Sequence, residues 1–374
     1  MRVLLTGGGT GGHVYPALAI AEALIEQGHE VYYAGTKEGV EASVLSQTEI
    51  PFYTIKAASL PRRPNAELFR SLSTNFQGLQ QAKALLRKIK PDLVFGTGGF
   101  VSGTIVWTAQ RLGVPTIIHE QNASPGLTNR LLAKKADRIC LTFEASATFF
   151  TNTKRCVWTG LPVRSALTEL TQEKGLSFYK LQPEKITILV TGGSRGARSL
   201  NIATVAALPK LLEQNKVQVI FATGTRGYTS VVQGLKELGI DPYETEGLVL
   251  KDYLHHMPEA IAAADLVVGR AGATFLAEIS MAGKTGVLIP YPYAAGDHQT
   301  ANAQIYAKQK AATVIADNDL SAETLLKALS PYIDEEDKRI LASKQSRSLA
   351  RPHAIQDILH LMSELTTKDG ERHG

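Results

Sequence analysis

Thr6-Gly7-Gly8-Gly9-Thr10-Gly11-Gly12-His13 follows a short apolar run at the start of the chain. Two further glycine-rich turns, GTGGF at residues 96–100 and TGGSRGA at residues 191–197, also follow apolar runs. A strand that ends in such a turn lets backbone N–H groups, and the positive end of the next helix, approach a phosphate closely. Three such turns predict two nucleotide-type folds that face a cleft.

Apolar strand-like runs alternate with helical patterns in both halves of the chain. The runs lie at residues 3–6, 31–34, 92–95, 116–118, 186–190, 217–221, 265–268 and 286–289. This alternation predicts parallel, doubly wound sheets of the α/β class. Helices are predicted from Pro16 to Leu24 and over residues 335–365. The pattern breaks near residues 161–164, so we predict one domain over residues 1–163 and a second over residues 164–345.

The composition is that of a two-domain protein of a reducing compartment. The chain has 374 residues, 44% of them hydrophobic, which is enough for two cores. It has two cysteines, and Cys140 lies in an apolar run that predicts a buried strand. The sequence shows no disulfide framework, no metal-ligand spacing, no signal peptide and no membrane-spanning run.

The positive charge is concentrated in the first half. Residues 1–163 contain 17 Lys and Arg against 11 Asp and Glu, whereas the remainder contains 23 against 24. A basic first domain suits nucleic acid, an anionic membrane or a pyrophosphate substrate. Scattered surface lysines are the alternative interpretation.

The first glycine turn also fits the dinucleotide pattern Gly7-x-Gly9-x-x-Gly12, but an acid that would bind the ribose is missing. The second strand is predicted to end near Gly35, and the nearest acid, Glu38, falls in a loop. A nicotinamide or flavin dehydrogenase is therefore disfavoured. His13 stands at a helix amino terminus, where a neutral imidazole that can accept a proton is favoured. A histidine that only caps the turn is the alternative.

Five motifs in order along the chain resemble the MurG family of bacterial N-acetylglucosaminyltransferases, which convert lipid I to lipid II. They are TGGHVYP at residues 10–16, GGFVSG at 98–103, HEQN at 119–122, GGSRGA at 192–197 and DHQ-x-x-N at 297–302. The resemblance implies a GT-B fold, in which two Rossmann-like domains flank a deep cleft and a final helix, about residues 346–365, joins the first domain. It implies UDP-N-acetylglucosamine (UDP-GlcNAc) and lipid I, undecaprenyl-pyrophosphoryl-MurNAc-pentapeptide, as substrates, no nucleic acid, and cell-wall or division proteins as partners.

The resemblance also implies a donor site. Its residues would be Thr10, Gly11, Gly12, Asn122, Arg164, Ser194, Leu254, Ala273, Thr274, Phe275, Glu278, Gln299 and Asn302. In this assignment Ser194 binds the diphosphate and Glu278 accepts both ribose hydroxyls. Phe275 is apolar where the family has a hydroxyl nearby, so the phosphate contact falls to Thr274 or to backbone. The first glycine turn would also cradle the pyrophosphate of the acceptor.

Inverting transfer needs a base for the acceptor hydroxyl. His13 is our first candidate, with Glu120 and His119 as competitors. The sequence has no Asp-x-Asp metal clamp, so no cofactor is predicted, although a divalent ion could act without protein ligands.

A lipid acceptor implies a membrane face. Leu68, Phe69, Leu72, Phe76 and Leu79 form an apolar helical stripe, with Arg62, Arg63, Arg70 and Lys83 nearby. Apolar stripes with basic flanks are typical of interfacial helices on anionic lipid, although a core stripe is the alternative. We expect a peripheral protein on the cytoplasmic face of the cell membrane.

Three functions remain open at this point. The first is lipid I glycosylation, and the second is another GT-B UDP-sugar transferase or a UDP-GlcNAc epimerase. The third is a nucleotide-sugar binder without turnover.

Overall fold

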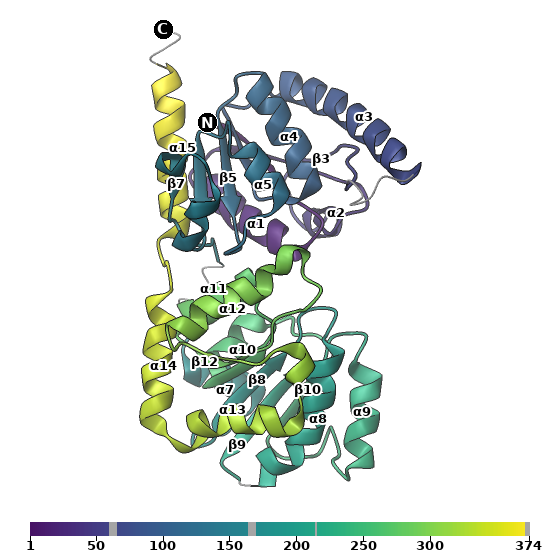
Figure 1. Ribbon diagram of the computed structural model, residues 1–374, viewed down its shortest axis with the longest axis vertical. Helices are drawn as coiled ribbons and strands as arrows, with labels where there is room; N and C mark the ends of the chain where they lie inside the picture. The colour runs from purple at the N-terminus through teal and green to yellow at the C-terminus, as the bar shows by residue number, and fades with distance from the viewer. Residues whose placement is uncertain (60–65, 164–169, 214, 371–374) are drawn as a thin grey trace. The chain divides into compact units, whose positions relative to one another are not determined.

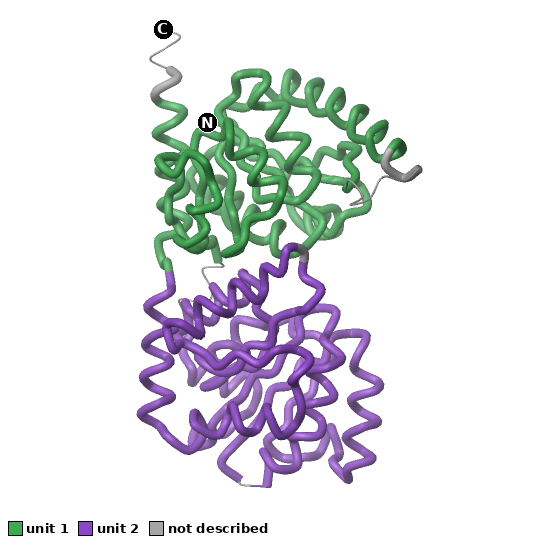
Figure 2. The backbone as a smooth tube through the Cα atoms, in the orientation of Figure 1, with its two compact units in different colours: residues 1–163, 351–374 green, residues 164–350 purple. Residues whose placement is uncertain are grey.

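The computed structural model describes residues 1–59, 66–163, 170–213 and 215–370. It divides the chain into two compact units (Figure 2): unit 1 comprises residues 1–163 and 351–374, and unit 2 comprises residues 164–350. Three residues named in the sequence analysis, Arg62, Arg63 and Arg164, lie outside the described residues.

Unit 1 is built on a seven-stranded parallel sheet in the order β3-β2-β1-β4-β5-β6-β7. The strands are β1 (Arg2–Thr6), β2 (Glu30–Gly35), β3 (Phe52–Thr54), β4 (Leu93–Gly96), β5 (Thr116–Glu120), β6 (Arg138–Leu141) and β7 (Cys156–Val157). The central strands are apolar and fully buried because helices cover both faces. The strand order reverses between β1 and β4, the position at which open α/β sheets bind ligands.

The helices of unit 1 form a layer on each face of this sheet. α1 (Gly11–Glu26), α2 (Val40–Leu45) and α15 (Ala354–Gly370) share one apolar core with the sheet. α3 (Ala66–Ile89), α4 (Gly99–Arg111) and α5 (Leu127–Leu132) share the other. On that side α3 packs beside α4, and α4 beside α5 (Figure 1). Two 3₁₀ helices, η1 (Glu144–Phe149) and η2 (Thr153–Arg155), precede β7.

Two predicted helix boundaries are wrong. α1 begins at Gly11 rather than at Pro16, because the amides of His13 and Val14 already donate to the Thr10 carbonyl. Pro16 then lies inside the helix, where its missing N–H removes one bond. The helical stretch over residues 335–365 is two helices, α14 (Glu336–Ser348) and α15, with Pro352 in the break between them.

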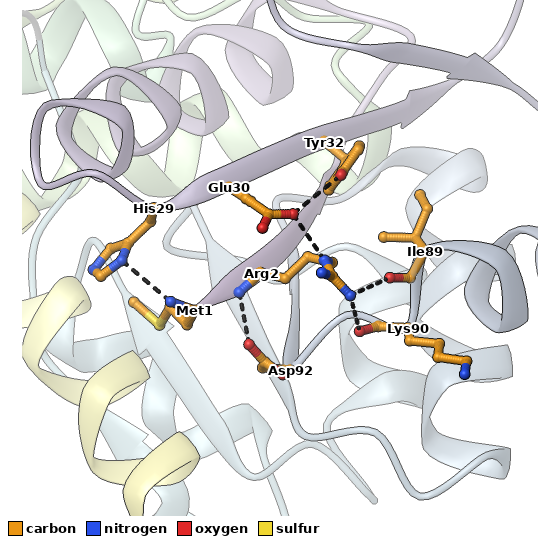
Figure 3. A network of polar contacts seen from close by, with 8 residues as sticks. All are labelled: Met1, Arg2, His29, Glu30, Tyr32, Ile89, Lys90 and Asp92. Atoms are coloured by element: carbon orange, nitrogen blue, oxygen red, sulfur yellow. Dashed lines mark hydrogen bonds and ion pairs between the residues drawn. The ribbon is translucent and has the colours of Figure 1, made fainter.

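Polar contacts connect the amino-terminal ends of the strands of the first sheet, whereas the glycine turns follow their carboxyl-terminal ends (Figure 3). The Arg2 amide donates to Asp92 at 2.6 Å, and the guanidinium donates to Glu30 at 2.9 Å and to the Ile89 carbonyl at 2.9 Å. These bonds join β1 to β2 and to the end of α3. We therefore assign these contacts a role in stabilising the fold of unit 1.

Unit 2 repeats the topology with six parallel strands in the order β10-β9-β8-β11-β12-β13. The strands are β8 (Ile186–Thr191), β9 (Val217–Ala222), β10 (Leu248–Lys251), β11 (Leu266–Gly269), β12 (Thr285–Leu288) and β13 (Thr313–Val314). The helices are α7 (Gln172–Tyr179), α8 (Arg198–Glu213), α9 (Tyr228–Glu237), α10 (Met257–Ala263), α11 (Ala273–Met281), α12 (His298–Lys308), α13 (Ala322–Asp334) and α14, with η3 (Ala295–Asp297) and η4 (Asp317–Asp319). The order reverses between β8 and β11. The predicted doubly wound architecture is confirmed in both units.

Candidate functional site at the strand ends

The first two glycine turns of unit 1 lie against each other where the strand order reverses. The Gly8 amide donates to the Gly98 carbonyl at 3.3 Å. A Cβ atom on Gly99 would collide with the Gly8 carbonyl, and Gly99 has a φ of 82° that other residues rarely adopt. Glycine is required at Gly99 because the backbones of the two turns touch there.

His13 lies in the first turn of α1, directly over this junction. Its Nδ1 atom is 2.9 Å from the Gly8 carbonyl oxygen and 3.3 Å from the Thr10 hydroxyl. Because a carbonyl only accepts, Nδ1 carries the proton, and a neutral ring then has its basic lone pair on Nε2. The ring packs on Gly98, where a Cβ atom would lie 3.1 Å from Cδ2. The geometry suits a base that acts through Nε2.

His119, at the end of β5, is enclosed in the protein. It has no exposed surface, and burial lowers its pKa to about 4. Its Nε2 donates to the Gly160 carbonyl at 2.8 Å, and its Nδ1 accepts from the Gln121 amide at 3.2 Å. Both ring nitrogens are therefore occupied within unit 1.

Glu120 is also buried, and burial raises its pKa although several N–H donors oppose the shift. Its carboxyl oxygens accept from the amide of Asn122 at 2.9 Å, from the side chain of Asn129 at 2.9 Å and from the amide of Gly126 at 3.2 Å. These contacts shape the segment after β5. Asn122 itself is half-buried on that segment.

The corresponding loops of unit 2 follow β8 and β11. Ser194 is exposed on the first loop, where the amide of Gly193 donates to the Thr191 hydroxyl at 3.2 Å. On the second loop α11 begins with Ala273, and the Thr274 hydroxyl oxygen is buried without a hydrogen-bond partner among the described residues. A buried hydroxyl left unpaired at a helix amino terminus fits an anionic ligand such as a phosphate.

The other predicted donor residues surround these loops. Asn302 is fully buried and donates to the Ala271 carbonyl at 3.1 Å, so its side chain supports the loop after β11. Gln299 accepts from the Tyr291 amide at 2.9 Å. Ala273 and Leu254 are buried, and Phe275 and Glu278 are half-buried on α11.

Sequence reasoning missed Arg270, which connects the loops of unit 2. Its guanidinium pairs with Asp317 at 2.5 Å and donates to the Ser199 hydroxyl at 3.2 Å and to the Pro290 carbonyl at 3.2 Å. In the sequence Ser199 lies 71 positions from Arg270, Pro290 lies 20 positions from it and Asp317 lies 47 positions from it. The only signal in the sequence was that Arg270 is a charged residue among the small residues of positions 269–273.

Glu41 was missed as well. It comes from α2, has no exposed surface, and accepts from the amide of Gly9 at 3.1 Å. An acid therefore does reach the first glycine turn, from 32 positions along the chain.

Within the segments that the structure describes, no three His, Cys, Asp or Glu side chains gather closely enough to hold a metal ion. No helix in these segments is both long and apolar enough to cross a bilayer.

Comparison with known proteins identifies the family. The model of the glycosyltransferase family 28 N-terminal domain matches residues 3–141, and that of the C-terminal domain matches residues 187–358. The chain belongs to glycosyltransferase family 28. The predicted GT-B fold and glycosyltransferase activity are confirmed.

The similar proteins agree with this family. The chain is 42% identical over 367 residues to a UDP-N-acetylglucosamine--N-acetylmuramyl-(pentapeptide) pyrophosphoryl-undecaprenol N-acetylglucosamine transferase of Desulforamulus reducens, covering 98% of this chain and 99% of that protein. It is 44% identical to the protein of the same name from Desulfitobacterium hafniense, covering 98% and 100%. Among solved structures, Acinetobacter baumannii MurG matches with a TM-score of 0.76 at 28% identity, covering 97% of this chain and 99% of that chain. The resemblance to the MurG family is thus confirmed.

Proposed function

We propose that this glycosyltransferase moves N-acetylglucosamine from UDP-GlcNAc to the C4 hydroxyl of the MurNAc sugar in lipid I, which forms lipid II. The observation that carries the proposal is the 42% identity, over nearly the full length of both chains, to a relative named for this reaction. Peptidoglycan synthesis is the process that this product serves.

Unit 2 holds the donor in this proposal. The buried, unpaired Thr274 hydroxyl and the amide-rich start of α11 receive the diphosphate, together with Ser194 on the loop after β8. Glu278 receives the ribose hydroxyls. Asn302 and Gln299 are assigned to the sugar, and the bonds of both side chains to loop backbone would fix the loops that surround it. As UDP leaves, these preorganised donors stabilise its developing charge.

Unit 1 holds the acceptor and supplies the base. The turn Thr10-Gly11-Gly12 binds the pyrophosphate of lipid I, and Asn122 contacts the donor sugar. Nε2 of His13 takes the proton from the acceptor hydroxyl while its oxygen bonds to the anomeric carbon and the bond to UDP breaks, with inversion. His119 and Glu120 are weaker candidates for the base because both side chains are enclosed in unit 1, whereas His13 is partly exposed.

A reconstituted reaction tests this function against its alternatives. Purified protein, UDP-GlcNAc and a lipid I analogue should yield UDP and a disaccharide product in equal amounts. His13→Ala should reduce transfer to a small residual rate and preserve UDP binding, whereas a binder without turnover would be unaffected. UDP release or epimerised UDP-sugar without a disaccharide that depends on the acceptor would reject the proposal.

The membrane face in this proposal is the layer of α3, α4 and α5. Phe69, Leu72 and Phe76 on α3 are 77%, 49% and 63% exposed, so this part of the stripe is not core. Leu127 and Leu131 on α5 are 71% and 57% exposed. The three helices contain one acid against six Lys and Arg. The exposed cations include Arg70, Lys83, Arg87, Lys88, Arg111 and Arg130.

Exposed apolar side chains among cations match the chemistry of an anionic lipid surface. Since lipid I is held in a bilayer by its polyprenyl chain, such a surface would place unit 1 beside its acceptor. We therefore assign the protein to the cytoplasmic face of the cell membrane as a peripheral protein.

A further inference from the structure

Glu41 is a carboxylate with no exposed surface that lies beneath the first glycine turn. One oxygen, Oε2, accepts from the amide of Gly9 at 3.1 Å. The other, Oε1, accepts from the amide of Thr36 at 2.9 Å and from its hydroxyl at 2.7 Å. Three donors thus hold both carboxylate oxygens in one orientation.

Glycines from three segments make room for this side chain. A Cβ atom on Gly8, Gly35 or Gly39 would lie closer than 3.0 Å to atoms of Glu41. Gly8 belongs to the glycine turn, Gly35 ends β2, and Gly39 precedes α2. The local sequence is therefore built around the carboxylate, and the close packing makes it a fixed part of unit 1.

The Gly8–Gly9 peptide connects Glu41 to His13. The N–H of this peptide, on Gly9, donates to Glu41, and its carbonyl, on Gly8, accepts from Nδ1 of His13 at 2.9 Å. Because both residues are glycines, side chains do not oppose rotation of the peptide plane. Its hydrogen bonds must therefore set the direction of the carbonyl.

We propose that Glu41 is a positioning residue for His13: its carboxylate fixes the Gly8–Gly9 peptide, whose carbonyl holds the imidazole as the tautomer protonated on Nδ1. This arrangement performs the task of the carboxylate that orients a catalytic histidine in hydrolases, with one peptide group interposed. The inference rests on the proposed function in so far as His13 is the base. The tautomer protonated on Nδ1 places the basic lone pair of the ring on Nε2, the atom proposed to take the acceptor proton.

Glu41→Gln is the decisive variant because it keeps the shape of the side chain and removes one acceptor. The amide NH₂ must face either the Gly9 N–H or the Thr36 N–H, and two donors repel each other. When the NH₂ group faces Gly9, the Gly8–Gly9 peptide loses its acceptor and can turn. When it faces Thr36, whose hydroxyl can accept from it, the bond to Gly9 remains, so two orientations of the peptide are expected. Glu38→Gln is the matched control, since Glu38 is an exposed acid three positions earlier.

The first measurement is the tautomer of His13, by nitrogen NMR of protein labelled with ¹⁵N-histidine. The chain has nine histidines, and a spectrum of His13→Ala identifies the signal. Wild type and Glu38→Gln should show protonated Nδ1 and unprotonated Nε2, whereas Glu41→Gln should show a mixture of tautomers. An unchanged His13 signal in both folded Glu41→Gln and folded Glu41→Asp overturns the inference. Should Glu41→Gln not fold, Glu41→Asp, which is too short to reach both partners, must show the same mixture, and an unchanged signal overturns the inference there.

The second measurement is turnover. Glu41→Gln should lower kcat by about 10- to 100-fold, which is the loss typical of removing a group that orients a functional histidine. The KM for UDP-GlcNAc should remain unchanged. In a His13→Ala background the same substitution should have no further effect. An equal loss in both backgrounds overturns the inference. A wild-type enzyme that makes no disaccharide would instead reject the proposed function, while the tautomer measurement still decides the role of Glu41.

Discussion

Weak acid should destabilise unit 1 through His119. Burial lowers the pKa of His119 from 6.5 to about 4 in the folded protein. In the unfolded chain the His119 imidazole therefore binds a proton below about pH 6.5. In the folded chain this imidazole stays neutral down to about pH 4. Stability is thus present above pH 6.5 and is lost as the pH falls. Between pH 7 and pH 5 the two pKa values give a loss of about 2 kcal/mol in the free energy of unfolding.

Urea unfolding followed by tryptophan fluorescence measures this loss. The chain has two tryptophans, Trp107 and Trp158, and both belong to unit 1, so the signal reports on that unit. His119→Gln is the reference variant because its amide can donate to the Gly160 carbonyl and does not titrate. Wild type should lose about 2 kcal/mol more than this variant between pH 7 and pH 5. Glu120, whose pKa burial raises, is present in both proteins, so its contribution cancels in the comparison.

Equal pH dependence in the two proteins would refute the reasoning. It would mean that the imidazole gains a proton as easily in the folded chain as in the unfolded one. A loss of kcat in His119→Gln without any change in stability would instead return His119 to the candidates for the base.

Three other predictions test the donor site, the membrane face and the last helix. Thr274→Val should weaken UDP binding by about 5- to 10-fold in calorimetry, the value of about one hydrogen bond, whereas Thr274→Ser should not. Replacing Phe69, Leu72 and Phe76 by serine should weaken sedimentation with anionic vesicles by at least about tenfold and spare turnover on a soluble acceptor. Unchanged sedimentation would exclude this face. Ending the chain after Ala350 removes α15, which buries two side chains fully in the core of unit 1. The urea midpoint detected by tryptophan fluorescence should therefore fall, and an unchanged midpoint would contradict this packing.

The strands and glycine turns were predictable because their signals are local. An apolar run followed by glycines identifies the end of a strand from a stretch of only about ten residues. The turns that follow β1, β4 and β8 lie where the sequence predicted them. Helix starts were less predictable. Proline is typical of a first helical position, but the capping geometry of Thr10, six residues before Pro16, determined the start of α1.

The parts of the site that the sequence did not reveal depend on contacts across the fold. The dinucleotide pattern led the search for an acid to the end of the second strand, where Glu38 falls in the loop, whereas Glu41 reaches the turn from the first turn of α2. Asn302 is similar, because spacing does not show which face of a helix is buried. Its position in α12 gave no sign that the side chain points to the Ala271 carbonyl.

The difference between the two units supports the proposed division of labour. Their sheets share one strand order, so topology alone would allow a nucleotide diphosphate at either reversal point. In unit 1 the protein's own carboxylate, Glu41, accepts the Gly9 N–H and places negative charge under the turn. In unit 2 the amide of Gly193 bonds the neutral Thr191 hydroxyl, and the buried hydroxyl oxygen of Thr274 has no partner among the described residues. During transfer the negative charge of the UDP diphosphate grows as the bond to the sugar breaks, whereas the pyrophosphate of the acceptor keeps its charge. The donors of unit 2 therefore suit the leaving group better than the turn over Glu41 does, which supports the proposed donor site in unit 2 and the proposed role of the unit 1 turn in holding His13 and the acceptor.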